Sequence, residues 1–117
     1  MLVRKNEIIN ILSETKLASG NFINQYGETC AVGAVLMQLV KPGTSTETLE
    51  ALGYLNAPAA QRPSAKPYIE SGDYLSALSI HFENVMYAYD DVYTEEVRDE
   101  ILSFVSKYFP AEISVNV

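Results

Sequence analysis

The sequence predicts a compact, mainly α-helical single domain over residues 1–117, with four to five helices around a buried central helix at residues 30–40 and a minor C-terminal β-strand. Three observations support this prediction. The length suits one domain, and a content of 48% hydrophobic and 20% charged residues is typical of globular proteins. Residues 73–89 and 94–108 carry apolar side chains at helical spacing. Residues 30–40 are almost entirely apolar, as in a helix buried on all sides.

Two helices are predicted in the N-terminal third. Residues 6–18 place isoleucine and leucine on one side of a helix that ends at Ser19-Gly20, because glycine tolerates the left-handed cap. Residues 30–40 could be a buried helix or a buried strand by periodicity alone. The length, the alanine, leucine and methionine content and the stop at Lys41-Pro42-Gly43 favour a helix.

The middle of the chain is predicted to contain a short helix and a long loop. Thr44 and Glu47 have the spacing of a capping box, which opens a helix that reaches Leu55. Residues 56–71 contain three prolines and little periodicity, which indicates a loop. Its length suggests a function, although a tolerated insertion would look the same.

The C-terminal half is predicted to form an antiparallel pair of helices, opened by the capping residues Asp73 and Thr94. A helix over 73–89 is followed by a helix over 94–108, where Pro110 lies beyond the end. The expected inward-facing residues are Leu75, Leu78, Phe82, Val85, Met86 and Tyr89 in the first helix and Val97, Ile101, Phe104, Val105 and Tyr108 in the second.

A short strand is predicted at residues 112–117, where apolar and polar residues alternate. Its best partner within the chain is the segment 21–26. Without such a partner the strand would leave an open edge, through which two copies of the chain could form a homo-oligomer.

Charge is distributed unevenly along the chain. The net charge is −7, with a balance of +1 over residues 1–69 and −8 over residues 70–117. The C-terminal half should therefore repel nucleic acids and anionic membranes and attract basic surfaces. Acidic helix faces that keep a small protein soluble are the plainer explanation.

Carboxylates and tyrosines are concentrated around the predicted turn between the last two helices. Tyrosine supplies contact area with little loss of entropy, and carboxylates steer a basic partner, so this pattern predicts a protein-binding face. A solvated helix junction would have the same composition. The candidate binding residues are Glu83, Tyr87, Asp90, Asp91, Tyr93, Glu95, Glu96, Asp99 and Glu100.

Cys30 carries the alternative hypothesis of a small thiol enzyme. It is predicted in the first turn of the 30–40 helix, where the helix dipole lowers the pKa of a thiol. His81, the single histidine, could serve as the base, and Gln25 lies shortly before Cys30, as a glutamine does in papain-like enzymes. Core packing explains a single cysteine equally well.

Several other classes of function are not expected. The acidic residues lack the glycine and the alternation of a calcium loop, and one histidine and one cysteine are too few for a transition-metal site. We therefore expect no metal, no cofactor, no direct contact with nucleic acid and no membrane segment. A single cysteine and the lack of a signal sequence predict a cytoplasmic protein.

Two segments, Leu17-Ala-Ser-Gly-Asn-Phe22 with Gln25 and Cys30-Ala-Val-Gly-Ala-Val-Leu36, carry a resemblance to a known group of proteins. They resemble an uncharacterised family of small proteins from tailed phages and prophages, whose members carry a Leu-x-Ser-Gly-Lys-Tyr-x-Gln motif before a Cys-Cys-Leu-Gly-Val-Leu segment. The family often has two or three cysteines, whereas this chain has one. The resemblance covers mainly residues 15–40. It implies a phage-type accessory protein that binds other proteins in the cytoplasm of a bacterial host.

Overall fold

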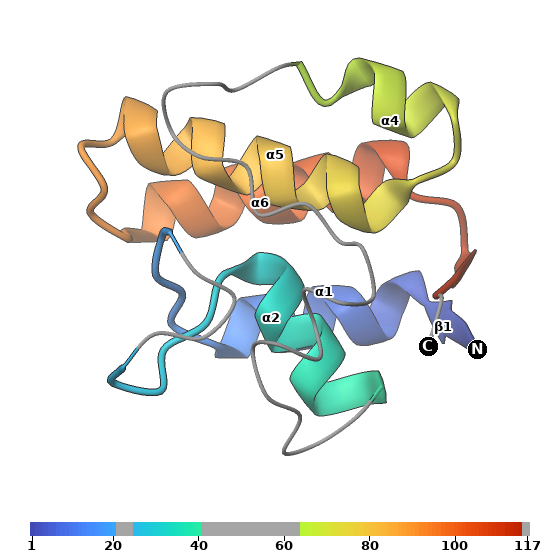
Figure 1. Ribbon diagram of the computed structural model, residues 1–117, viewed down its shortest axis with the longest axis horizontal. Coiled ribbons are helices and arrows are strands. Elements are labelled where there is room, and N and C mark those ends of the chain that lie inside the picture. The colour runs from blue at the N-terminus through green and yellow to red at the C-terminus, as the bar shows by residue number, and fades with distance from the viewer. Residues whose placement is uncertain (21–24, 41–63, 116–117) are drawn as a thin grey trace.

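The computed structural model describes residues 1–20, 25–40 and 64–115. Helices dominate these ranges, and their strands form one two-stranded sheet. The mainly α fold class with a minor β element is thus confirmed. The elements, drawn in Figure 1, are β1 (Leu2–Arg4), α1 (Lys5–Glu14), α2 (Ala31–Val35), the π-helix η1 (Leu36–Val40), α4 (Lys66–Glu70), α5 (Tyr74–Ala88), α6 (Glu95–Tyr108) and β2 (Glu112–Ser114).

The α5 and α6 helices run side by side in opposite directions, and α1 and α2 lie beneath them (Figure 1). The predicted capping residues are confirmed. Asp73 accepts a hydrogen bond from the backbone N–H of Ser76 at 3.3 Å, and Thr94 accepts one from that of Val97 at 3.3 Å. The predicted inward-facing residues are buried or partly buried, apart from Tyr108, which is 45% exposed. The prediction for Tyr108 was wrong in part: its ring contacts that of the core residue Phe104, with centroids 5.1 Å apart, but the rest of the side chain faces solvent at the end of α6.

The α5 helix is more enclosed than its periodicity predicts. Because α2, α4 and α6 all pack against it, side chains on its polar side are buried as well. These are Ser76, Ser79 and Glu83. A helix with neighbours on three sides has little surface left for solvent, so its polar positions no longer mark an outer face.

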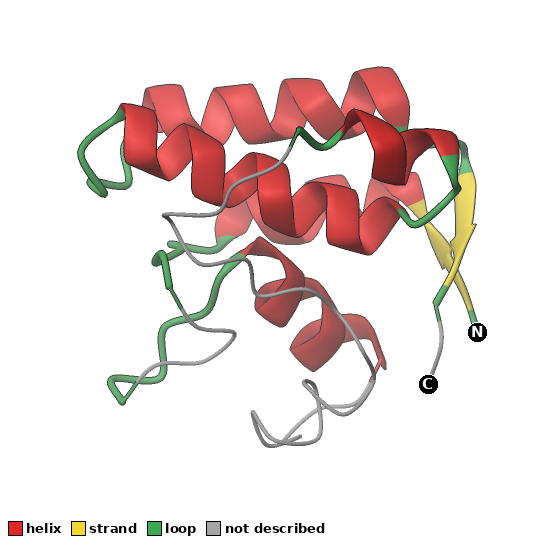
Figure 2. Cartoon of the chain, turned by 45° about the horizontal axis from the view of Figure 1, so that its top comes forward, coloured by secondary structure: helices red, strands yellow, loops and turns green. Residues whose placement is uncertain are grey.

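The predicted central helix at residues 30–40 is present. All five residues of α2 are buried, and the helix continues without interruption into η1 (Figure 2). It packs against both α1 and α5. Contact on both sides accounts for the wholly apolar sequence of α2. The η1 part is less enclosed than predicted, because Met37 and Leu39 are only partly buried and Gln38 is exposed.

The α1 helix is shorter than predicted and ends at Glu14. Thr15 already has extended backbone angles, and the N–H of Ala18 donates to the carbonyl of Thr29 at 2.9 Å. Leu17 and Thr29 form an isolated parallel bridge. The predicted end at residue 18 was wrong because this pairing with a distant segment replaces the last helical turn.

The two ends of the chain form the sheet. Strand β1 pairs antiparallel with β2 (Figure 2). Val3 lies opposite Ile113, and both side chains are buried. The predicted pairing of the C-terminal strand with residues 21–26 was therefore wrong. Helix α1 follows β1 directly and packs against α6, so the two ends meet at the same place.

The central part of the chain can be compared with the prediction only in part. The predicted helix over 44–55 lies outside the described residues, as does the predicted loop up to residue 63. The rest of that predicted loop contains α4. Pro67 lies in the first turn of α4. The N–H groups of a first turn have no partner within the helix, so the missing N–H of proline costs nothing there, and proline is compatible with the start of a helix.

Candidate functional site

The turn between α5 and α6, residues 89–94, holds two adjacent aspartates in the left-handed backbone conformation. Asp90 has φ 56° and Asp91 has φ 59°. Their N–H groups donate to the carbonyls of Tyr87 at 3.1 Å and Met86 at 2.7 Å, which caps the C-terminal end of α5. Glycine is the usual residue for such positions, although aspartate tolerates them better than most. Both aspartates are exposed.

The helix dipoles treat the carboxylates on the two sides of the turn differently. Glu95 and Glu96 lie in the first turn of α6, where negative charge is favourable. Asp90 and Asp91 follow the C-terminal end of α5, where negative charge is unfavourable. The interaction with the helix dipole therefore stabilises α6 through its two glutamates, whereas the two aspartates destabilise the end of α5.

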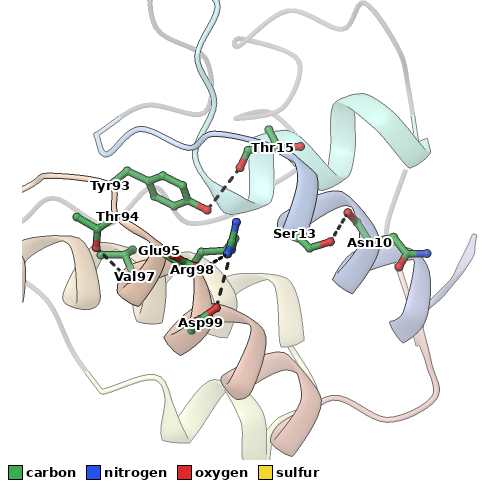
Figure 3. Close-up of polar contacts among 9 residues, drawn as sticks. All are labelled: Asn10, Ser13, Thr15, Tyr93, Thr94, Glu95, Val97, Arg98 and Asp99. Carbon is green, nitrogen blue, oxygen red and sulfur yellow. Dashed lines mark hydrogen bonds and ion pairs between the residues drawn. The ribbon is translucent and has the colours of Figure 1, made fainter.

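Arg98 neutralises part of the acidic charge on one side of α6. Its guanidinium lies 3.1 Å from the carboxylate of Glu95 and 3.8 Å from that of Asp99 (Figure 3). Tyr93 lies on the same side and donates from its hydroxyl to the carbonyl of Thr15 at 3.4 Å (Figure 3). Burial raises the pKa of Tyr93, so its hydroxyl stays protonated at neutral pH.

Glu96 and Glu100 lie about 100° further around α6 than Glu95 and Asp99 do, although Glu96 still neighbours Asp99, which is three residues away. The hydroxyl of Tyr89 donates to Glu100 Oε1 at 3.0 Å, and this hydrogen bond raises the pKa of Tyr89. The acidic residues of α6 are therefore spread over a broad part of the helix surface instead of one narrow face.

Glu83 does not belong to this surface, and its assignment to the binding face was wrong. Its side chain is only 3% exposed and accepts a hydrogen bond from the N–H of Gly20 at 3.1 Å. Gly20 has φ 103°, a conformation that suits glycine. Glu83 thus fixes the turn after α1 against α5.

A groove of about 370 Å³, here called the turn groove, borders the α5–α6 turn. Residues 16–19 and Glu28 form one wall, and Met86 with residues 91–93 forms the other. Its charged side chains are Asp91, Glu28 and Lys16. Sequence reasoning missed the first wall, because it depends on the extended pairing of Leu17 with Thr29 and helical periodicity gives no sign of that pairing.

Two residues that flank Asp90 and Asp91 in the sequence, Tyr87 and Val92, have exposed apolar side chains. The side chain of Tyr87 is 66% exposed and that of Val92 is 58% exposed. Val92 also lines the turn groove. Apolar contact area next to carboxylates is the composition that protein-binding surfaces favour over ordinary surface.

The expected thiol chemistry of Cys30 does not fit its surroundings. Cys30 is the N-cap of α2, and the N–H of Gly33 donates to its Sγ at 3.4 Å. The thiol is nevertheless 1% exposed, and burial raises its pKa to about 12. The expectation of a lowered pKa was wrong, because the loss of water around the thiolate outweighs the dipole of a short helix.

The structure does not bring Cys30, His81 and Gln25 together. The Cys30 thiol faces Glu83, whose charge raises its pKa further. His81 precedes Glu83 by two residues, which is about 200° around α5, so it points to the other side of the helix. There its ring stacks on Phe104 with centroids 4.0 Å apart, while Gln25 is exposed.

Comparison of the chain with models of protein families, with curated proteins and with solved structures gives no significant match. Within the described ranges, no helix combines the length and apolar character needed to cross a membrane. The same ranges contain no group of three or more histidine, cysteine, aspartate or glutamate side chains arranged to hold a metal ion.

Proposed function

We propose that this chain is a non-enzymatic protein-interaction module that binds a basic partner protein through the α5–α6 turn and the turn groove. One observation carries the proposal. Two neighbouring positions that favour glycine hold exposed aspartates, which lie at the unfavourable end of a helix dipole. Residues kept against local stability are often found at functional sites.

The turn groove suggests how a partner would be recognised. A lysine or arginine side chain that enters it would meet the carboxylates of Asp91 and Glu28 and could lie against the ring of Tyr93. Carboxylates give charge-assisted hydrogen bonds, and an aromatic face attracts a cation. Tyr87 and Val92 would add apolar contact outside the groove.

The uneven charge of the chain also favours a basic partner that approaches the C-terminal half. The balance of −8 over residues 70–117 would steer a basic surface toward this half of the chain. Among the acids of α6, Glu95 and Asp99 are already paired with Arg98. We therefore assign the main role to Asp90 and Asp91 and a steering role to Glu95, Glu96, Asp99 and Glu100.

The origin and place of the partner are part of the proposal. The resemblance of residues 15–40 to a phage family favours a phage-type accessory protein that acts in the cytoplasm of a bacterial host, so the partner is sought in a bacterial lysate. A homo-oligomer formed through residues 112–117 remains a separate prediction. Since β2 already has β1 on one edge, a second copy would have to add to the other edge.

The test compares proteins captured from a bacterial lysate by the wild-type chain and by the double variant D90N/D91N. Asparagine keeps the size and the tolerance of left-handed backbone and removes only the charge. The matched control is E7Q/E112Q, which removes two exposed carboxylates, one in the first turn of α1 and one in β2. The sheet of β1 and β2 lies at the end of the molecule opposite the α5–α6 turn (Figure 1).

We expect a basic protein, identified by mass spectrometry, to be retained by the wild type and by E7Q/E112Q and to be lost with D90N/D91N. Its retention should weaken as salt is added, because the attraction is between charges. Equal retention by all three proteins would show that binding does not use this turn.

A further inference from the structure

His81 is a titratable side chain that the proposed protein-binding surface does not use. It is the single histidine of the chain and lies in the middle of α5. Its ring stacks on that of Phe104 in α6, with centroids 4.0 Å apart and an angle of 9° between the planes. Phe104 belongs to the hydrophobic core, so the imidazole lies with one face against the core.

One nitrogen of this ring is shielded from water. Nε2 of His81 has almost no accessible surface, and it has no hydrogen-bond partner in the described part of the chain. Whichever tautomer the neutral ring adopts, the protonated ring carries an N–H at both nitrogens. Protonation in the stacked position would therefore place a charged N–H at Nε2 with neither water nor an acceptor, and an unpaired buried donor of this kind is costly.

The stacked position favours the neutral ring. Burial lowers the pKa of His81 below the ordinary imidazole value of 6.5, and this effect exceeds the opposing attraction of Glu100. The face of Phe104 attracts a cation as well, which favours the charged ring in the stack. That attraction acts through the face of the imidazole, however, and supplies no acceptor for the N–H at Nε2, which lies in the plane of the ring.

Open space beside the ring gives the protonated form a second position. His81 borders a cavity of about 530 Å³ between α4 and the α5–α6 pair. It also borders an open groove of about 260 Å³, here called the α6 groove. Because protein fills neither space, a change of side-chain rotamer can move the imidazole out of the stack without moving the backbone. The α6 groove is lined by His81 and by Glu100, Ser103, Phe104, Lys107 and Tyr108.

The charged groups around His81 favour the α6 groove over the cavity as the position of a protonated ring. Glu100 is exposed in the groove, so its carboxylate can pair with an imidazolium there. Lys107 opposes this pairing, although its ammonium lies over the ring of Tyr108, 5.1 Å from the centroid. In the cavity, the charged side chain among the described lining residues is Lys66, which repels a second cation. Helix α2, which also packs on α5, is wholly apolar.

We propose that His81 is an acid-sensitive switch whose ring, once protonated, leaves Phe104 and turns into the α6 groove to pair with Glu100. The hydrogen bond from Tyr89 uses Oε1 of this carboxylate and leaves Oε2 for the imidazolium. The movement uncovers one face of Phe104, a core side chain that is 8% exposed in the stacked form. The switch needs no partner protein, so it does not depend on the proposed protein binding.

The test follows the ring of His81 by NMR of the intact protein, from about pH 8 downward until the ring is protonated. Because the chain has one histidine, its ring signals are assigned without ambiguity. In the neutral form we expect nuclear Overhauser contacts between the rings of His81 and Phe104, and His81 ring protons shifted upfield by the ring current of Phe104. Both should be lost on protonation, with a midpoint below pH 6.5.

Two outcomes of this titration would overturn the proposal directly. Contacts with Phe104 that persist in the protonated ring would mean that the stack accommodates the charge. A midpoint at or above pH 6.5 would mean that the stacked position does not favour the neutral ring. Circular dichroism at each pH separates the switch from acid unfolding. The helical signal should stay constant through the midpoint, and its loss together with the ring contact would show that protonation unfolds the protein instead.

A pair of carboxylate variants tests where the ring goes. E100Q should lower the midpoint, because the imidazolium loses its partner in the groove. The matched control is D99N, which removes the neighbouring carboxylate of α6, about 100° around the helix and paired with Arg98, and should shift the midpoint less. In the protonated wild type, contacts from the His81 ring to the Glu100 side chain should replace those to Phe104. The absence of such contacts, or equal midpoints in E100Q and the wild type, would overturn the proposal.

Discussion

The two left-handed aspartates allow a direct test of whether this turn is built for stability or for binding. Replacing both with glycine should stabilise the protein. Relief of the left-handed strain contributes about 1 kcal/mol per residue, and removing a carboxylate from a helix C-terminus about 0.3 kcal/mol. The greater freedom of glycine in the unfolded chain offsets about 0.6 kcal/mol per residue. For the pair the net gain is about 1–2 kcal/mol.

The assay is thermal unfolding followed by circular dichroism, with urea unfolding as a second measure. For a chain of this size, 1 kcal/mol corresponds to roughly 4 °C in Tm, so D90G/D91G should melt about 4–8 °C higher than the wild type. D90N/D91N is the matched control, since it removes the charge and keeps a side chain. It should gain only about 0.5 kcal/mol.

A loss of stability in D90G/D91G would refute the reasoning. It would mean that the aspartate side chains make stabilising contacts, so that their presence needs no functional explanation. A gain in stability together with lost partner capture is the expected combination, because residues that serve binding are commonly those that stability alone would replace.

Three further predictions concern the core. H81F should raise the free energy of unfolding by about 1 kcal/mol at pH 7, because it removes an unpartnered buried nitrogen and keeps the stacking on Phe104. Since the pKa of His81 is lowered by folding, the unfolded state binds its proton first as the pH falls. The wild type should therefore lose stability below the ordinary imidazole pKa of about 6.5, and H81F should lose less over that window in urea titrations at several pH values. The Cys30 thiol should react with a thiol reagent at pH 8 only as fast as the protein unfolds, and rapid labelling of the native protein would contradict its raised pKa. E83A should destabilise by about 2–3 kcal/mol, because it removes a hydrogen bond to a charged and buried acceptor, and E83Q by less; equal, small effects in urea unfolding would show that this contact contributes little.

The helices of the C-terminal half were predictable because local signals and tertiary packing agree there. Asp73 and Thr94 supply the caps, and the apolar spacing of 75–86 and 97–105 matches the buried residues. A capping side chain and an apolar stripe act within one or two turns, so they can be recognised in the sequence without knowledge of the fold.

The errors arose where distant segments decide the local structure. Residues 15–18 leave the helix to pair with Thr29, and the C-terminal strand pairs with β1 instead of the nearer segment. Burial explains the two misplaced site residues. Glu83 and Cys30 have the chemistry of functional groups, but neighbouring helices cover both. Nothing in the residues around them shows that α5 would be packed on three sides.

The pairing of the two ends of the chain has a consequence for the order of folding. The backbone of Met1 binds that of Val115, 114 residues away along the chain, next to the three residue pairs of β1 and β2. Closing so long a loop before the helices have packed would lose much conformational entropy for few hydrogen bonds. Once α1 has packed on α6, the two ends of the chain are already neighbours, so pairing the strands loses little further conformational entropy. We therefore expect the helices to assemble first and the terminal strands to join last, so that a pair of fluorophores at the two ends would report the final step of folding.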